Sequence, residues 1–170
     1  YKYNPTSSSY HGVTQYNDQF EKFNFNSIEE YKADIYRFII ELSQIDESDL
    51  NQKHLINYFI INEFLSELYN ENYNINYYSY SPDYFLNIIY DSLFLIIYNN
   101  SLDMDNKVES IIKRLKLILP SISEIKRNLI YYSKYEVDKS TQLVLIINQI
   151  LDNLPLYINS DINTLDLIDE

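Results

Sequence analysis

The chain has 170 residues, including one Gly, four Pro and no Cys, and its formal net charge at pH 7 is −12. The scarcity of Gly argues against a sheet with many tight turns, and the absence of Cys excludes disulfides, thiolate metal sites and thiol catalysis. The acidic balance disfavours nucleic acid and anionic membrane surfaces as partners, because both carry negative charge. Length and composition therefore favour a single helical domain that is large enough to bury a core.

Residues 1–26 predict an extended, irregular N-terminal arm, because they contain the single Gly, a run of Ser and no sustained helical periodicity. The arm is rich in aromatic residues, which is unusual for a free linker. Two interpretations stay open: the arm packs along its own bundle, or it docks on another protein. We expect it to be loosely held in the isolated chain and fixed in a complex, because ordering each residue costs about 1–2 kcal/mol. The candidate partner-binding residues of the arm are Tyr3, Tyr10, Tyr16 and Phe20.

Residues 27–155 predict a helical bundle. A capping box formed by Ser27 and Glu30 begins the first helix, and apolar residues follow at three- and four-residue spacing. The second helix is expected over about 50–69, and the sequence also allows it to continue for one further turn. Its inward-facing residues are expected to be Leu55, Phe59, Phe64, Leu65 and Leu68.

The most apolar segment, 82–98, is apolar on every face of a helix, which is typical of a helix in the middle of a bundle. Ser81 is placed to cap this helix and Pro82 fits its first turn. The segment is interrupted by polar residues and is shorter than the roughly 20 apolar residues that a membrane span needs. It therefore predicts a buried helix.

The next helix begins after Asp103 or Asp105, either of which can cap it, and its apolar stripe reaches Pro120. Residues 121–124 repeat the capping-box pattern, so 106–134 is either one helix kinked at Pro120 or two helices, and the box favours a break. The last strong helix restarts at 138–140 and ends at Pro155, followed by an acidic tail over 156–170. The sequence thus predicts an all-α, antiparallel bundle of four to six helices around the central 82–98 helix.

Motifs for chemistry are lacking. His11 and His54 have none of the spacings of metal ligands, and the acids from Asp103 to Glu109 fail the pattern of a calcium loop. With one Gly, a glycine-rich phosphate loop is impossible. We predict no metal, no cofactor and no catalytic set, and hence a chain that is not an enzyme.

The segment 107–139 carries an excess of Lys and Arg over Asp and Glu, in contrast to the rest of the chain. This stripe is either a solvated face that balances acidic neighbours within the fold or a surface that docks on an acidic protein partner. For the second interpretation the candidate residues are Lys113, Arg114, Lys116, Lys126 and Arg127.

These features favour a non-catalytic interaction protein, an accessory or extrinsic subunit that docks on a larger protein assembly. The arm-and-bundle outline is similar to that of the PsbQ-like extrinsic lumenal subunits of photosystem II, which implies docking on a membrane complex. The alternative is a viral or host-directed regulator of Bcl-2-like shape that binds a partner helix in a groove. The central apolar helix suits that family, but its Gly-Arg pair is missing, since Gly12 precedes Val13. The lack of Cys and of an initiator Met favours an exported or organelle-lumen location.

Overall fold

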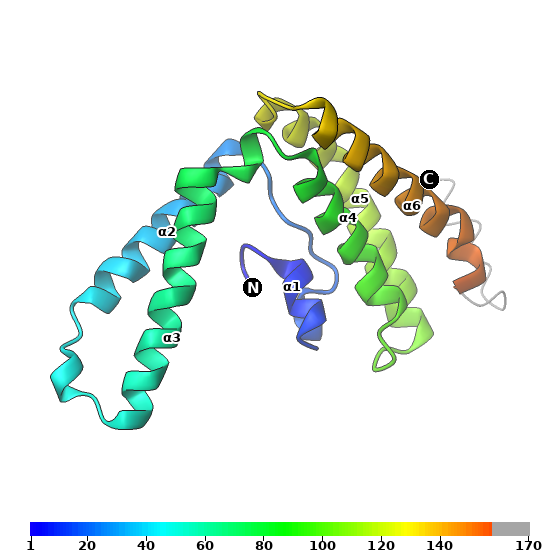
Figure 1. Cartoon of the computed structure of the whole chain (residues 1–170). Coiled ribbons are helices and arrows are strands. Elements are labelled where there is room, and N and C mark those ends of the chain that lie inside the picture. The colour runs from blue at the N-terminus through cyan, green and yellow to red at the C-terminus, as the bar shows by residue number, and fades with distance from the viewer. Residues whose placement is uncertain (158–170) are drawn as a thin grey trace.

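The computed structural model describes residues 1–157, and the regular elements in that range are all helical, which confirms the all-α prediction (Figure 1). Of the acidic tail predicted over 156–170, residues 158–170 lie outside the described residues. The five long helices are α2 (Phe25–Ser43), α3 (Gln52–Tyr69), α4 (Pro82–Ile97), α5 (Met104–Asn128) and α6 (Lys134–Tyr157). The short elements are α1 (Pro5–Tyr10), the 3₁₀ turns η1 (Thr14–Tyr16), η2 (Glu47–Asp49) and η4 (Tyr77–Ser79), and the π-helical segment η3 (Asn70–Ile75).

The helices form two packed groups (Figure 1). In the first group, α4 packs against α1, α5 and α6. In the second, α2 and α3 pack against each other as a hairpin that projects away from the first group. The main hydrophobic core belongs to α4, α5, α6 and the arm, and the buried apolar residues of the hairpin, Ile28, Ile35 and Leu65, are not part of it.

Asn and Asp side chains cap the N-termini of three of the long helices. Asn24 Oδ1 accepts a hydrogen bond from the Ser27 amide at 3.0 Å, so α2 starts before Ser27 and the predicted role of Ser27 as cap is wrong. Asn51 caps α3 in the same way, and Asp103 caps α5, as one of the two predicted alternatives. Ser81 holds the predicted N-cap position of α4, but its hydroxyl donates to the Asp83 carboxylate instead of capping the backbone.

α5 continues through Pro120 without a break, so the favoured division of this helix is wrong. Proline removes the one N–H that would bond to the carbonyl of Lys116. Both residues are exposed, and a carbonyl on the solvent side of a helix can bond to water in place of the missing N–H. The Ser121 hydroxyl donates to the Leu117 carbonyl within the helix and does not cap a new one. The chain breaks later, between Asn128 and Lys134, and α6 then includes Pro155.

The connection from the hairpin to α4 is irregular. α3 runs directly into η3, which is the further turn that the sequence allowed for the second helix. Asn76 ends this turn in the left-handed conformation with φ of 54°, which Asn tolerates better than most residues. The chain thereby changes direction before η4 and α4, and this separates the hairpin from the main core.

Candidate interaction surfaces

The N-terminal arm packs on its own helices, which is the first of the two interpretations that the sequence left open. Phe20 is buried in the main core, where its ring meets the edge of Phe23 at 5.8 Å between centroids. Tyr3 is half-buried against Tyr31, and its hydroxyl donates to the Asp34 carboxylate. Tyr16 is also half-buried. Of the four predicted docking aromatics, Tyr10 alone is largely exposed, at 74 %.

Arg114 fastens the arm to α4. Its side chain is fully buried, with 0 % exposure, so it is not presented to a partner as the sequence analysis supposed. The guanidinium donates to the carbonyl of Ser92, to Ser9 Oγ at 2.7 Å and to the carbonyl of Tyr16 at 3.4 Å. Burial lowers the pKa of Arg114 to about 10, and the charges of the nearby acids raise it in part. The sequence missed this role because a buried Arg has no local signature.

A pocket of about 120 Å³ lies between the arm, α2 and α4. Glu21 lines it, but the Thr6 amide and hydroxyl occupy both of its carboxylate oxygens at 2.9 Å. Burial raises the pKa of Tyr31 and of Tyr84 to about 12 each, and it raises the pKa of Tyr78 further. The pocket therefore presents neutral phenols and a carboxylate that is already hydrogen-bonded, and the charged residues Lys2, Lys22 and Glu30 also line it.

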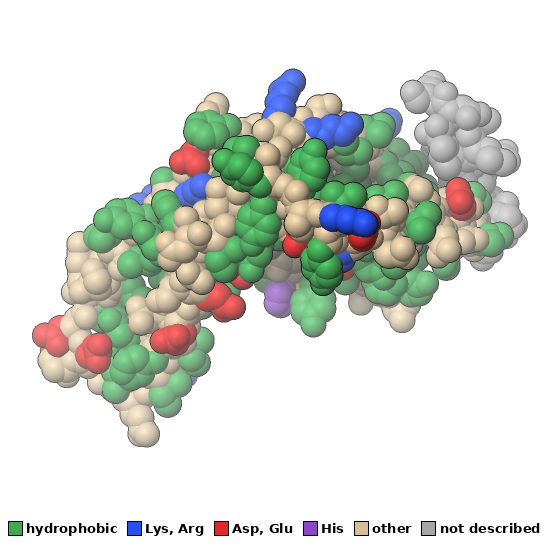
Figure 2. Space-filling model, turned by 45° about the horizontal axis from the view of Figure 1, so that its top comes forward, with side chains coloured by type: hydrophobic (Ala, Val, Ile, Leu, Met, Phe, Trp, Pro, Cys, Tyr) green, Lys and Arg blue, Asp and Glu red, His purple; other side chains and the backbone are tan. Residues whose placement is uncertain are grey.

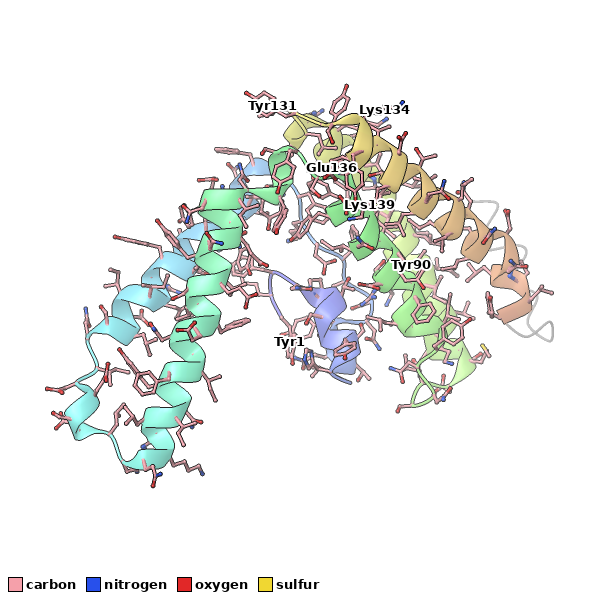
Figure 3. All side chains as sticks on the ribbon, in the orientation of Figure 1. Tyr1, Tyr90, Tyr131, Lys134, Glu136 and Lys139 are labelled. Atoms are coloured by element: carbon pink, nitrogen blue, oxygen red, sulfur yellow. The ribbon has the colours of Figure 1, made fainter. Side chains whose placement is uncertain are left out.

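The basic face of α5 consists of Lys113, Lys116, Lys126 and Arg127, which are all exposed. Lys113 is paired with Glu109 at 2.8 Å and with Asp18 at 3.5 Å. The other three make no ion pair with any residue of 1–157. Exposed apolar side chains adjoin this face on α5 and on the turn that follows it, where Figure 3 labels Tyr131: these are Leu119, Ile122, Ile130, Tyr131 and Tyr132.

Lys139, the last basic residue of the segment 107–139, stabilises the fold. It donates to Asp83 at the start of α4 and so ties α6 to α4; Figure 3 labels Lys139 beside Glu136 on α6. Burial by itself raises the pKa of Asp83, but hydrogen bonds from Lys139 and Ser81 outweigh burial and lower it. The basic segment therefore divides into buried or paired residues that hold the fold and unpaired ones that face outward.

The α2–α3 hairpin carries a second exposed apolar surface, the outer face of α3. Phe59 and Phe64 were predicted to point inward, and both are exposed. Large apolar side chains follow one another along this face: Ile56, Phe59, Ile60, Ile61 and Phe64. The signal was present in the sequence, because α3 is apolar on all sides, as a helix buried in a larger core would be.

The two surfaces differ in charge. Residues 25–75 contain ten Asp and Glu against three Lys and Arg, whereas α5 contains six Lys and Arg against three Asp and Glu. In Figure 2 acidic side chains stand at the tip of the hairpin, and most of the visible Lys and Arg side chains stand over the middle of the molecule among hydrophobic ones. The hairpin and α5 thus carry opposite net charge, and each has exposed apolar side chains.

Among residues 1–157, no group of three or more His, Asp and Glu side chains is placed to hold a metal ion. No helix in the described range is both long and apolar enough to cross a bilayer. Comparison with known proteins found no matching family model, no similar curated protein and no similar solved structure.

Proposed function

We propose that this chain is a non-catalytic helical interaction protein, an accessory subunit that docks on a larger protein assembly through the basic face of α5. The observation that carries the proposal is the combination of three unpaired cations, Lys116, Lys126 and Arg127, with exposed Leu, Ile and Tyr side chains on the same helix and the turn after it. Tyr and Arg are enriched at the energetic centres of protein interfaces. Basic residues around an apolar centre steer an acidic partner and fix its orientation.

The pocket supports the non-catalytic part of the proposal. Each carboxylate oxygen of Glu21 accepts a hydrogen bond from Thr6, which gives this side chain a structural role within the arm. A tyrosine that acts as a general base near neutral pH needs a lowered pKa, and burial moves the pKa of Tyr31 and Tyr84 in the opposite direction.

The test uses the full chain to capture a stoichiometric partner from native material. The capture is then repeated with variants in which one Lys of the basic face is changed to Glu. We expect Lys126→Glu, and separately Lys116→Glu, to weaken capture by about tenfold or more, because a lost attraction becomes a repulsion. Lys22→Glu reverses one exposed charge on the arm and serves as the matched control. Equal capture by all three variants would refute docking through the basic face of α5.

A groove between α1 and α4 favours the Bcl-2-like alternative. It encloses about 450 Å³ and is lined on α4 by Ile88, Tyr90, Phe94 and Leu95, with Asp91 among them. An amphipathic partner helix with a basic residue beside its apolar stripe fits such a lining. In the same capture assay, loss of the partner with Phe94→Asp and retention with Lys126→Glu would support this alternative over docking through α5.

A further inference from the structure

The outer face of α3 holds a stripe of five residues whose spacing is symmetric. Lys53, Ile56, Ile60, Phe64 and Glu67 follow one another at steps of three, four, four and three residues, which keeps them on one side of a helix. All five side chains are exposed. The stripe therefore has an apolar centre with Glu63 at its edge, a cation at one end and an anion at the other, and Ile60 is its midpoint.

Because of this symmetry, the stripe is complementary to the same stripe on a second copy whose α3 runs antiparallel. When two α3 helices run antiparallel about an axis through Ile60, each Ile60 meets its counterpart and each Ile56 meets Phe64 of the other copy. The same register brings Lys53 beside Glu67, and the two-fold axis makes this contact twice. A parallel arrangement would instead place Lys53 beside Lys53 and Glu67 beside Glu67, so the charges select the antiparallel one.

Neither Lys53 nor Glu67 forms an ion pair with another residue of 1–157, so both charges remain for an external partner. The acidic tips of the two hairpins lie far from each other in this arrangement. Leu50, which follows η2, is ten residues from Ile60, so the two tips lie about 30 Å apart at 1.5 Å per residue. That separation exceeds the Debye length of about 8 Å at physiological ionic strength.

We infer that α3 binds α3 of a second copy in this antiparallel register, so that the two α2–α3 hairpins associate through their α3 helices. The contact covers the outer face that the monomer leaves exposed and completes the burial expected of a helix that is apolar on all sides. This interface is separate from the basic face of α5 and does not depend on the partner proposed above.

The test measures the mass of the full chain by sedimentation over a wide range of protein concentration. We expect a monomer–dimer equilibrium that Ile60→Glu abolishes, because this change places two carboxylates against each other on the two-fold axis. The substitution preserves the monomer fold, since Ile60 is 62 % exposed, and circular dichroism checks that it does. Ile40→Glu, at an exposed position of α2 outside the stripe, is the matched control and should leave the dimer intact.

The register is tested by exchange of charges. Lys53→Glu alone and Glu67→Lys alone should each weaken dimerisation by about tenfold, because each change occurs in two symmetric contacts. The double variant should restore it. A wild-type chain that stays monomeric, a dimer that tolerates Ile60→Glu, or a double variant without restoration would overturn the inference.

Dimerisation lost with Lys116→Glu and kept with Ile60→Glu would also overturn it, because this result indicates a contact between the acidic hairpin of one copy and the basic α5 of another. Capture of a partner by the basic face of α5 is read out in a different assay. Failure of dimerisation and failure of the proposed function are therefore distinguishable.

Discussion

The two packed groups of this chain contain similar helices in different surroundings. In the group around α4, the side chains of Phe85, Leu93, Ile96 and Ile111 are each at most 1 % exposed, and polar contacts such as Lys139 with Asp83 join the elements. In the α2–α3 hairpin, Ile28, Ile35 and Leu65 are the buried apolar residues, and the outer face of α3 is uncovered. Both groups contain helices that an Asn or Asp side chain caps: α2 and α3 in the hairpin and α5 in the group around α4.

The difference shows that local helix signals do not determine how much a helix contributes to tertiary stability. Most of the stability of protein helices comes from the packing of an apolar face, and an isolated two-helix hairpin has one such contact. The α4 group holds its own core. The hairpin leaves its remaining apolar residues uncovered, and the α3–α3 contact inferred above would bury them.

The largest expected effect is a contrast between two Phe→Ala substitutions. Phe85→Ala removes a ring that is 1 % exposed in the main core, and it should lower the free energy of unfolding by about 3–5 kcal/mol. Phe64→Ala removes a ring that is 58 % exposed on α3, and in the monomer it should cost no more than about 0.5 kcal/mol.

The measurement is denaturant unfolding followed by circular dichroism, at a protein concentration low enough to keep the chain monomeric. At high concentration Phe64→Ala should lower stability further, because it weakens the α3–α3 contact. Equal losses for the two variants in the monomer would mean that the hairpin is packed as firmly as the α4 group, and the comparison would fail.

The sequence predicted the helical class and the approximate helix positions, because apolar spacing and polar caps are local signals. It did not predict which sides of a helix would be covered. Phe59 and Phe64 were assigned to the interior since they are large and apolar, but their exposure depends on the direction of the chain after Asn76. That turn follows from tertiary packing, which no window of the sequence contains.

The candidate site shows the same limit. Lys116, Lys126 and Arg127 are exposed as a basic surface requires, whereas Arg114 of the same stripe is buried. Charge alone does not separate these cases, since position on the helix decides them. Arg114 lies on the side of α5 that faces α4 and the arm, where the carbonyl of Ser92 and the hydroxyl of Ser9 accept its hydrogen bonds.

A smaller effect is expected when the attachment of the arm is removed. Arg114→Met should lower the free energy of unfolding by about 1–3 kcal/mol, because the buried Ser92 carbonyl loses its donor from Arg114. The arm should also become mobile, so cleavage by trypsin after Lys22 should accelerate. Lys116→Met, at an exposed position of the same helix, is the control and should change neither property. An unchanged rate of cleavage in Arg114→Met would show that the other contacts of the arm, such as Phe20 in the core and Tyr3 with Asp34, hold it without Arg114.

The smallest expected effect concerns pH and the group around α4. Burial raises the pKa of Glu21 above its ordinary value of 4.5, although hydrogen bonds from Thr6 and the charge of Arg114 lower it in part. A raised folded-state pKa means that the folded chain holds this proton more tightly than the unfolded chain does. The resulting stabilisation is fully present below pH 4.5 and is lost as the pH rises through the folded-state pKa.

Glu21→Gln cannot titrate, so the difference in unfolding free energy between wild type and variant should change with pH in that window. Denaturant unfolding at a series of pH values measures it, and the wild type should lose stability relative to Glu21→Gln as the pH increases. For Asp83→Asn, the difference in unfolding free energy from wild type should change with pH in the opposite direction, because hydrogen bonds from Lys139 and Ser81 lower the pKa of Asp83. Its contribution is present above pH 3.8 and is lost as the pH falls through the folded-state pKa. If wild type and Glu21→Gln keep a constant difference at all pH values, Glu21 titrates as it does in the unfolded chain, and the arm does not exclude water from it.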